Sequence, residues 1–453
     1  MTRMTMDDVE AFLHAHPGVE RIELMFPDMN GVMRGKWYAP DSADKLVEGK
    51  VRLPMSTYAL DIEGNDVDET GLAIATGDPD GYGWPVPGTM AVMPWWPTPS
   101  AQVLMTMTTP SGEPCVYDPR TRLAAVVERL AARGLTAVVA TELEFYLHAP
   151  AGEPGAPPVP PKGLEGAQVY DLNAVTALAP CLEDIQHICA VQNIAADVLI
   201  AEFGPGQFEI NFHHTNDALG MADQSILFKR LVKGCARAHG LRATFMAKPY
   251  GGDLAGSGMH AHVSLIDAGG NNIFDDRKGA GADGIAPALR HAVGGALATM
   301  RPLQAIYAPH ANSYRRFQPG SYAPTIASWG LDHRGVAVRL PETSGPGARL
   351  EHRICGADVN PYLALAGVLG GIEIGLDRAI EPPRRIEETG SPEGERLHHD
   401  WFSAVEEFSQ SDIARHIFGE AFHAAYYKVR FSEIARLGAQ VTDAEYRTYL
   451  HKL

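Results

Sequence analysis

Near the N-terminus, two segments alternate hydrophobic and polar residues on either side of Asn30-Gly31. They form the stretch "VERIELMFPDMNGVMRGKWYA", residues 19–39. Because Asn-Gly readily adopts the backbone angles of a tight turn, this pattern predicts a β-hairpin. The irregular, Gly- and Pro-rich chain that follows predicts surface loops.

The pattern changes near residue 110. Asp118 and Pro119 have the residue types of a helix N-cap and a first helical position, and helical spacing of apolar residues continues to Gly134. The apolar segment 135–148 predicts a buried strand, strands and helices alternate to about Arg378, and the remaining chain predicts amphipathic helices. We therefore expect an α+β protein with a small β-rich domain over residues 1–109 and a large domain over residues 110–453.

Composition limits the classes of partner. The chain has 453 residues, 45% of them hydrophobic, and a formal net charge of −17. A phosphate backbone needs basic patches, so nucleic acid is not an expected partner. We expect neither a membrane span nor a signal peptide, and five cysteines without a CxxC pair predict reduced core thiols and a cytoplasmic protein.

Polar residues recur inside apolar strand segments, where residues i and i+2 point to the same face. One such pair alone is also typical of a solvated sheet face or a satisfied core histidine. Buried carboxylates are costly without positive charge, so the set together favours hard cations, Mg²⁺ or Mn²⁺, and phosphoryl chemistry. The residues are Glu142 and Glu144, Glu202 and Glu209, His260 and His262, and Glu351 with Arg353.

Arginines near glycine-containing loops form a second group. A guanidinium makes bidentate contacts to carboxylates and phosphates, although surface ion pairs are the alternative interpretation, which we adopt for Arg315. The other members are Arg316, Arg334, Arg339 and Arg353.

Six motifs, in this order, resemble the glutamine synthetase superfamily. They are "TELEF", "AEFGPGQFEI", "ATFMAKPYGGDLAGSGMHAHVSL", "NSYRRFQPG", "AVRLP" and "RLEHRICGADVNPYLALA". The resemblance covers most of residues 110–375. It implies a small N-terminal β-grasp-like domain and a large catalytic domain with a curved antiparallel sheet. It also implies ATP-dependent ligation of glutamate to an amine through γ-glutamyl phosphate, with two or more Mg²⁺ or Mn²⁺ ions in each site.

The resemblance also implies roles for individual residues. Glu144, Glu202 and Glu209 match the ligands of one metal, and Glu142, His260 and Glu351 match those of the other. His262, Ser264, Arg334 and Arg339 match ATP contacts, whereas Gly256, Arg316 and Arg353 match contacts to glutamate. The catalytic positions are those of Arg316, Arg334, Tyr322 and Asp61.

One departure bears on the amine. Enzymes that use ammonia carry Pro-Gly-Tyr-Glu-Ala-Pro in a flap, and this chain reads "PGSYAP" at residues 319–324. Tyr322 replaces the glutamate, and a neutral phenol cannot serve as that carboxylate near neutral pH. The chain is therefore similar to the γ-glutamylamine synthetase branch, and a polyamine such as putrescine or spermidine is the expected acceptor.

An acidic loop bears on the same choice of acceptor. The loop either attracts a polycationic amine, or it is an ordinary solvent-exposed acidic loop without a role in binding. Its carboxylates are Asp61, Glu63, Asp66, Asp68 and Glu69.

Other functions remain open from the sequence. They are γ-glutamyl monoamine synthesis, ammonia-dependent glutamine synthesis, and a non-catalytic amine sensor or structural ring. A metallohydrolase would need a zinc-type histidine cluster, which the sequence lacks. The resemblance further implies a homododecamer of two hexameric rings, with active sites between subunits.

Overall fold

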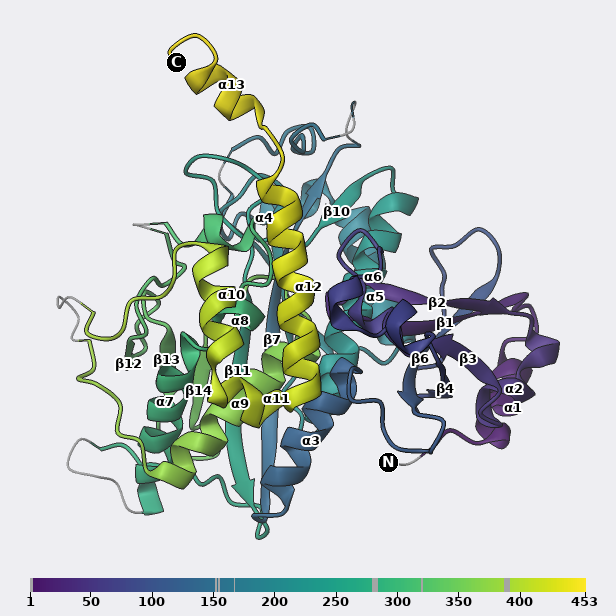
Figure 1. Cartoon of the computed structure of the whole chain (residues 1–453), viewed down its shortest axis with the longest axis horizontal. Helices are drawn as coiled ribbons and strands as arrows, with labels where there is room; N and C mark the ends of the chain where they lie inside the picture. Colours follow the sequence, from purple (N-terminus) through teal and green to yellow (C-terminus); the bar gives the residue numbers. More distant parts are fainter. Residues whose placement is uncertain are drawn as a thin grey trace.

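Two β-sheets organise the chain (Figure 1). The structure, a computed structural model, describes residues 3–150, 153, 155–166, 168–278, 284–318, 321–386 and 392–453. The first sheet has the order β2-β1-β6-β4-β3, with β5 paired to β6. Its strands are β1 (Arg21–Pro27), β2 (Met33–Tyr38), β3 (Val51–Pro54), β4 (Asp80–Pro85), β5 (Ala91–Val92) and β6 (Ser100–Thr108).

The hairpin predicted at Asn30-Gly31 is confirmed. Strands β1 and β2 pair antiparallel with Pro27 opposite Met33, and Gly31 has a φ of 75° in the turn between them. Strand β1 also pairs in parallel with β6, which returns the chain to the middle of the sheet. Helices α1 (Met6–Ala15) and α2 (Asp44–Val47) complete this part of the molecule.

The second sheet is larger and, apart from the parallel pair β12–β13, antiparallel. Its order is β12-β13-β14-β11-β7-β9-β8, and β10 pairs with the end of β7. Its strands are β7 (Leu135–His148), β8 (Ala196–Ala201), β9 (Gln207–Phe212), β10 (Arg242–Thr244), β11 (Met259–Asp267), β12 (Trp329–Leu331), β13 (Val338–Glu342) and β14 (Arg349–His352). The predicted buried strand at residues 135–148 is thus β7, at the centre of the sheet.

A layer of helices covers one face of this sheet. Helices α3 (Pro119–Ala131) and α6 (Ala218–Ala238) contact β7, α7 (Pro287–Met300) contacts β13 and β14, and α9 (Pro361–Arg378) packs against all three helices. The remaining helices are α4 (Leu172–Ala177), α5 (Ala179–Val191), α8 (Gln304–Tyr307), α10 (Trp401–Gln410), α11 (Asp412–Phe418), α12 (Glu420–Gly438) and α13 (Asp443–Tyr449).

Two hydrophobic cores share the first sheet. Leu24 and Val103 face the smaller core, whereas their neighbours Met25 and Leu104 join the large core of the second sheet. Because side chains alternate between the two faces along β1 and β6, one face packs in each core, and this shared packing joins the two sheets. The expected α+β class is confirmed, and the division into residues 1–109 and 110–453 stays a prediction.

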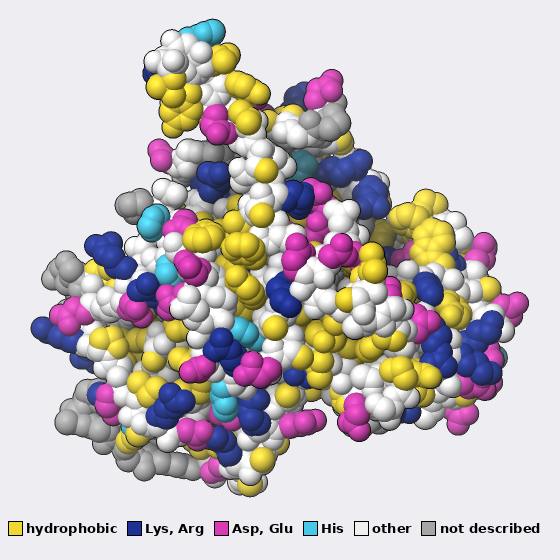
Figure 2. Space-filling view, in the orientation of Figure 1, with side chains coloured by type: hydrophobic (Ala, Val, Ile, Leu, Met, Phe, Trp, Pro, Cys, Tyr) yellow, Lys and Arg dark blue, Asp and Glu magenta, His cyan; other side chains and the backbone are white. Residues whose placement is uncertain are grey.

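The C-terminal helix α13 projects from the body of the molecule (Figures 1 and 2). Tyr446, Tyr449, Leu450 and Leu453 are exposed there, and Figure 2 shows hydrophobic side chains on this projection. Among the described helices, none combines the length and hydropathy that a bilayer-spanning helix needs. All five cysteines are buried and free, as expected.

Substitution of the N-cap of α3 tests how the two sheets are joined. The Asp118 carboxylate accepts hydrogen bonds from the Arg120 backbone N–H at 2.9 Å and the Thr106 hydroxyl of β6 at 2.5 Å. Asp118→Ala removes the cap and leaves the half-buried Thr106 hydroxyl without this partner, so we expect it to lower the free energy of unfolding by about 2 kcal/mol in urea titration. Asp217→Ala removes the exposed cap of α6, and it should cost only about 1 kcal/mol. Equal losses would contradict a joining role for Asp118.

Candidate active site

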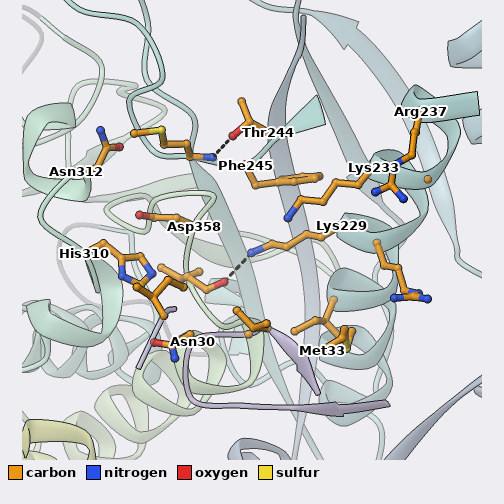
Figure 3. A pocket seen from close by; sticks show the side chains of 18 of the residues that line it. Asn30, Met33, Lys229, Lys233, Arg237, Thr244, Phe245, His310, Asn312 and Asp358 are labelled. Atoms are coloured by element: carbon orange, nitrogen blue, oxygen red, sulfur yellow. Dashed lines mark hydrogen bonds between the residues drawn. The ribbon is translucent and has the colours of Figure 1, made fainter. Parts of the chain in front are cut away.

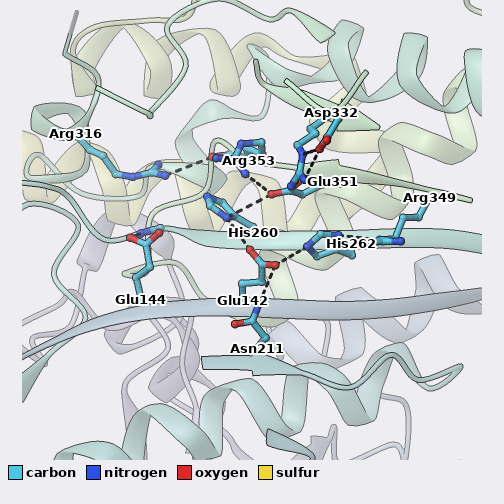
Figure 4. Close-up of polar contacts among 12 residues, drawn as sticks. Glu142, Glu144, Asn211, His260, His262, Arg316, Asp332, Arg349, Glu351 and Arg353 are labelled. Atoms are coloured by element: carbon cyan, nitrogen blue, oxygen red, sulfur yellow. Dashed lines mark hydrogen bonds and ion pairs between the residues drawn. The ribbon is translucent and has the colours of Figure 1, made fainter. Parts of the chain in front are cut away.

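Alternation along β7 separates apolar from acidic side chains. Thr141, Leu143 and Phe145 are fully buried, and the Thr141 hydroxyl lies 2.9 Å from that of Ser225 on α6. These residues therefore face the helix layer. Glu142 and Glu144 point to the opposite face of the sheet (Figure 4).

Strand β11 places its histidines beside Glu142. His260 pairs in register with Glu142, and its Nδ1 lies 3.1 Å from a Glu142 oxygen. The Nε2 of His262 lies 2.9 Å from the other Glu142 oxygen. Burial opposes ionisation of Glu142, but hydrogen bonds with His260 and His262 outweigh it and hold the pKa of Glu142 well below its usual range.

Arginines surround Glu351, whose side chain is fully buried. Its carboxylate accepts a hydrogen bond from Arg339 at 2.8 Å and pairs with Arg353 (Figure 4). Burial opposes ionisation, but the charges of His260 and Arg353 prevail and lower the pKa of Glu351. The nearest oxygen of Glu351 lies 3.6 Å from His260 Nδ1, so this ion pair joins the cluster at Glu142.

At the other end of the cluster, carboxylates crowd one another. Glu144 lies opposite Glu209 of β9 in register. Burial and the charge of Glu202 raise the pKa of Glu144 to about 7. Burial and then the charges of Glu142 and Glu144 raise the pKa of Glu209 well above its usual range, and burial raises the pKa of Glu202. These three carboxylates ionise together only if positive charge is supplied.

Glu202 is placed by a tight turn that follows β8. The Glu202 N–H donates to the Gln207 carbonyl at 2.9 Å across this turn. A Cβ on Gly204 would lie 1.8 Å from the Tyr146 hydroxyl, which donates to the Ala255 carbonyl at 2.7 Å. Only glycine fits there, so the first glycine of the Gly-Pro-Gly sequence between Glu202 and Glu209 has a steric cause.

The donor set fits hard divalent cations. Two groups offer ligand atoms within 4.8 Å of one another: Glu142, Glu209 and His260, and Glu142, His262 and Glu351. Carboxylate-rich sets with one imidazole suit Mg²⁺ or Mn²⁺, and a cation beside Glu144 and Glu209 would offset the burial and the like charges that raise their pKa values. Glu142 belongs to both groups, His262 joins one of them although it was expected to contact ATP, and Glu144 and Glu202 belong to neither. The assignment of the six expected ligands to two metal sites therefore stays a prediction.

The arginine expected to contact glutamate lies beside Gly256. A Cβ on Gly256 would come within 2.8 Å of Arg316 Cγ, so glycine leaves room for this side chain. Arg316 is buried and donates to the Ile354 carbonyl at 2.8 Å. The charge of Arg316 also reaches Glu144, so Gly256 and Arg316 lie near the Glu144 end of the acidic cluster, whereas Arg353 pairs with Glu351 and acts on Glu144 as well.

Three of the four residues expected to contact ATP come from strands of this sheet: His262 and Ser264 from β11, and Arg339 from β13. Ser264 follows His260 and His262 at strand spacing, and all three side chains are buried. Arg339 bridges Glu351 and Asp332, whereas Arg334 is exposed and its charge acts on Glu202.

Tyr322 and Asp61 occupy different surroundings. Tyr322 is 61% exposed, and its ring centroid lies 5.6 Å from that of Phe203, the residue after Glu202. Within "PGSYAP", Pro319 and Gly320 lie outside the described residues. Asp61 is buried, held by Asn65 and 3.8 Å from Arg436 of α12, and no described contact joins it to the acidic cluster of its own chain.

Residues that support the cluster escaped the sequence analysis. Gln207 donates to Glu144 at 3.1 Å, Asn211 donates to Glu142 at 3.0 Å, and Arg349 donates to His262 at 3.3 Å. The His214 ring lies 5.9 Å from that of His262. The sequence does indicate two of them, because Gln207 and Asn211 lie two residues before and after Glu209 in "GQFEINF" and so share its face of the strand.

Comparisons with known proteins agree with this geometry. A family model for the glutamine synthetase catalytic domain matches residues 116–449. Gamma-glutamylputrescine synthetase PuuA from Escherichia coli (strain K12) is 37% identical over 446 residues, covering 97% of this chain and 93% of that protein. Gamma-glutamylethanolamide synthetase GlnA4 from Streptomyces coelicolor (strain ATCC BAA-471 / A3(2) / M145) is 33% identical over 445 residues, covering 96% of this chain and 93% of that protein.

The fold has a close match among solved structures. A structure of GmaS in complex with ADP superimposes with a TM-score of 0.85 at 28% identity, covering 98% of this chain and 100% of that chain.

Cation binding should release protons. Because the pKa of Glu144 is raised to about 7 and that of Glu209 is raised well above its usual range, protons compete below neutral pH with a cation, which binds the ionised carboxylates. We expect the affinity for Mg²⁺ to rise as pH rises from 5 to 7. Calorimetry in two buffers of different ionisation enthalpy measures the protons released.

A matched pair of variants controls this measurement. Glu144→Gln cannot titrate and should release fewer protons, whereas Glu165→Gln, which alters an exposed carboxylate outside the cluster, should behave as wild type. The same proton release from Glu144→Gln as from wild type would contradict cation binding at Glu144.

Proposed function

The chain belongs to the glutamine synthetase family, and we propose that it joins L-glutamate to a polyamine, putrescine or spermidine, at the expense of ATP. It is a C–N bond-forming ligase whose substrates are glutamate, ATP and an amine. The acidic, arginine-flanked sheet face is the single observation that carries the proposal, because phosphoryl transfer to a carboxylate needs both kinds of charge.

The reaction has two balanced steps. The γ-carboxylate oxygen of glutamate attacks the γ-phosphorus of ATP, and the bond to the ADP oxygen breaks. The amine nitrogen then attacks the acyl carbon of γ-glutamyl phosphate, the C–O bond breaks, phosphate leaves, and the nitrogen loses a proton. Phosphorylation is required because a free carboxylate is a poor electrophile.

In this proposal, one group of residues binds glutamate and another binds ATP. Arg316 and Arg353, with the backbone at Gly256, hold glutamate, whereas His262, Ser264, Arg334 and Arg339 contact ATP. A bidentate guanidinium matches both carboxylate and phosphate. Arg334 and Arg316 also stabilise the negative charge that develops during transfer.

Mg²⁺ or Mn²⁺ would be held by the six ligands, in the two sets that the family resemblance implies. When bound, the ions neutralise the phosphate oxygens and lower the charge repulsion that opposes attack by a carboxylate. The first set is Glu144, Glu202 and Glu209, and the second is Glu142, His260 and Glu351.

Tyr322 is proposed to shape the amine pocket. Its ring and that of Phe203 form an apolar wall next to Glu202, which suits an alkyl chain carrying an ammonium group. An ammonia-using enzyme would need a carboxylate at this position. Ethanolamine and monoamines also fit a wall of this kind, and they remain the alternatives.

We also propose a cytoplasmic homo-oligomer, a dodecamer in which Asp61 serves the site of a neighbouring subunit. Two observations support the oligomer. Asp61 lies apart from the described acidic cluster of its own chain, and apolar side chains are exposed on α13.

An amine panel tests the proposed substrate. Phosphate release is measured with ATP, Mg²⁺ and glutamate plus ammonium, methylamine, isopropylamine, ethanolamine, putrescine or spermidine. We expect putrescine or spermidine to exceed ammonium at least about tenfold in kcat/KM, equal to about 1.4 kcal/mol of preferential transition-state binding. Preference for a monoamine would retain the ligase and reject the polyamine, and preference for ammonium would reject the role given to Tyr322.

Tyr322→Glu isolates that role. A carboxylate at this position can help to deprotonate ammonium, so the ratio of kcat/KM for ammonium to that for putrescine should rise about tenfold or more. Tyr322→Phe keeps the apolar ring and should preserve the amine preference. An unchanged ratio in Tyr322→Glu would contradict the assignment.

A further inference from the structure

A cavity lies apart from the acidic sheet face. Its volume is about 520 Å³, within the range of small-molecule sites, and none of the six proposed metal ligands lines it. Its walls come from the β1–β2 turn, the segment with Trp95 and Trp96, helix α6, the chain around Phe245, and the segments that hold His310 and Asp358. Figure 3 shows the side chains of Lys229 and Lys233 extending from α6 into this space.

The charges of the lining are unbalanced. Among the residues that line the cavity, Lys229, Arg230, Lys233 and Arg237 are basic, and Asp358 is the one carboxylate. Arg230 already pairs with Glu23. Within the described chain, no ion pair is made by Lys233 or Arg237.

The two lysines converge on one ring. The ammonium nitrogens of Lys229 and Lys233 lie 5.8 Å and 5.9 Å from the centroid of Phe245. Lys229 donates one hydrogen bond, at 2.6 Å, to the Val359 carbonyl, and an ammonium group has three N–H donors. Burial lowers the pKa of Lys229 to about 7, and the nearby charge of Asp358 opposes this shift. An anion placed beside Lys229 would likewise favour its charged form.

We propose that this cavity binds a small dianion with a flat body, whose charges pair with Lys229 and Lys233 and whose body packs against Phe245. Trp95 and Trp96 also line the cavity, so the walls offer aromatic surface as well as positive charge. Nucleic acid is too large for this volume, and the chain's net charge of −17 opposes it.

The cavity is connected to the active site through Asp358. The Asp358 carboxylate accepts a hydrogen bond from the Ser313 hydroxyl at 2.6 Å, and Ser313 begins the short helix Ser313–Arg316. A dianion beside Lys229 changes the electrostatic field at Asp358. Because Asp358 accepts the Ser313 hydrogen bond, this change can reach Arg316 at the other end of the same short helix. The effect is a changed KM for glutamate, and this part rests on the role proposed for Arg316.

Calorimetry with phthalate, a flat dicarboxylate, tests binding without turnover. Glutamate is kept saturating so that its own site is filled. We expect phthalate to bind wild type, and Lys233→Gln to bind about tenfold more weakly, the loss of one charge-assisted hydrogen bond. Lys45→Gln removes the same charge from an exposed site outside the cavity and should match wild type. No binding at millimolar phthalate, or equal affinity in all three proteins, would overturn the proposal.

Kinetics tests the connection separately. Phthalate should change the KM for glutamate in wild type and Lys45→Gln, and change it much less in Lys233→Gln at the same concentration. An unchanged KM in wild type at saturating phthalate would overturn the connection to Arg316. Failure of the ligase proposal would be seen instead as absent turnover with every amine.

Discussion

Repulsion among carboxylates on one face of the larger sheet is the constraint on which the site depends. Glu144 and Glu209 stand opposite each other on paired strands, and both have raised pKa values because they are buried and face like charges. Arginines compensate Glu351 at the other end of the row, where its pKa is lowered. Cations bound between Glu144, Glu209 and Glu142 would complete this compensation of charge. A need to bind cations would explain why so many acids lie on this face of the sheet.

The remaining structure holds these acids in place. Amide side chains of Gln207 and Asn211 each donate to one carboxylate, and the Gly258 backbone N–H donates to Glu144 at 2.8 Å. Helices on the opposite face bury the intervening apolar residues of β7, so the strand cannot shift by one residue without exposing its core side. A rigid row of charge allows phosphoryl transfer because its dipoles need no reorganisation during the reaction.

Local patterns predicted much of this arrangement. The hairpin at Asn30-Gly31, the cap of α3 at Asp118 and strand β7 follow from turn chemistry, capping and periodicity. Alternation at positions i and i+2 also predicted which side chains share the face of the sheet.

Contacts between distant segments could not be predicted in this way. The pairing of His260 with Glu142, and of Glu144 with Glu209, depends on register between strands far apart in sequence. The ion pair of Asp61 with Arg436 joins residues from opposite ends of the chain. Gln207 and Asn211 were missed for another reason. Their amide side chains carry no charge, and only the acid between them, Glu209, was considered as a site residue.

Anomalous scattering from crystals grown with Mn²⁺ tests most directly whether the acidic face holds cations. We predict at least two ordered Mn²⁺ ions, within about 2.0–2.6 Å of oxygens or imidazole nitrogens from Glu142, Glu144, Glu202, Glu209, His260 and Glu351. Crystals that bind Mn²⁺ elsewhere but not at the acidic face would contradict this prediction. Turnover at full rate without any divalent cation would contradict it as well.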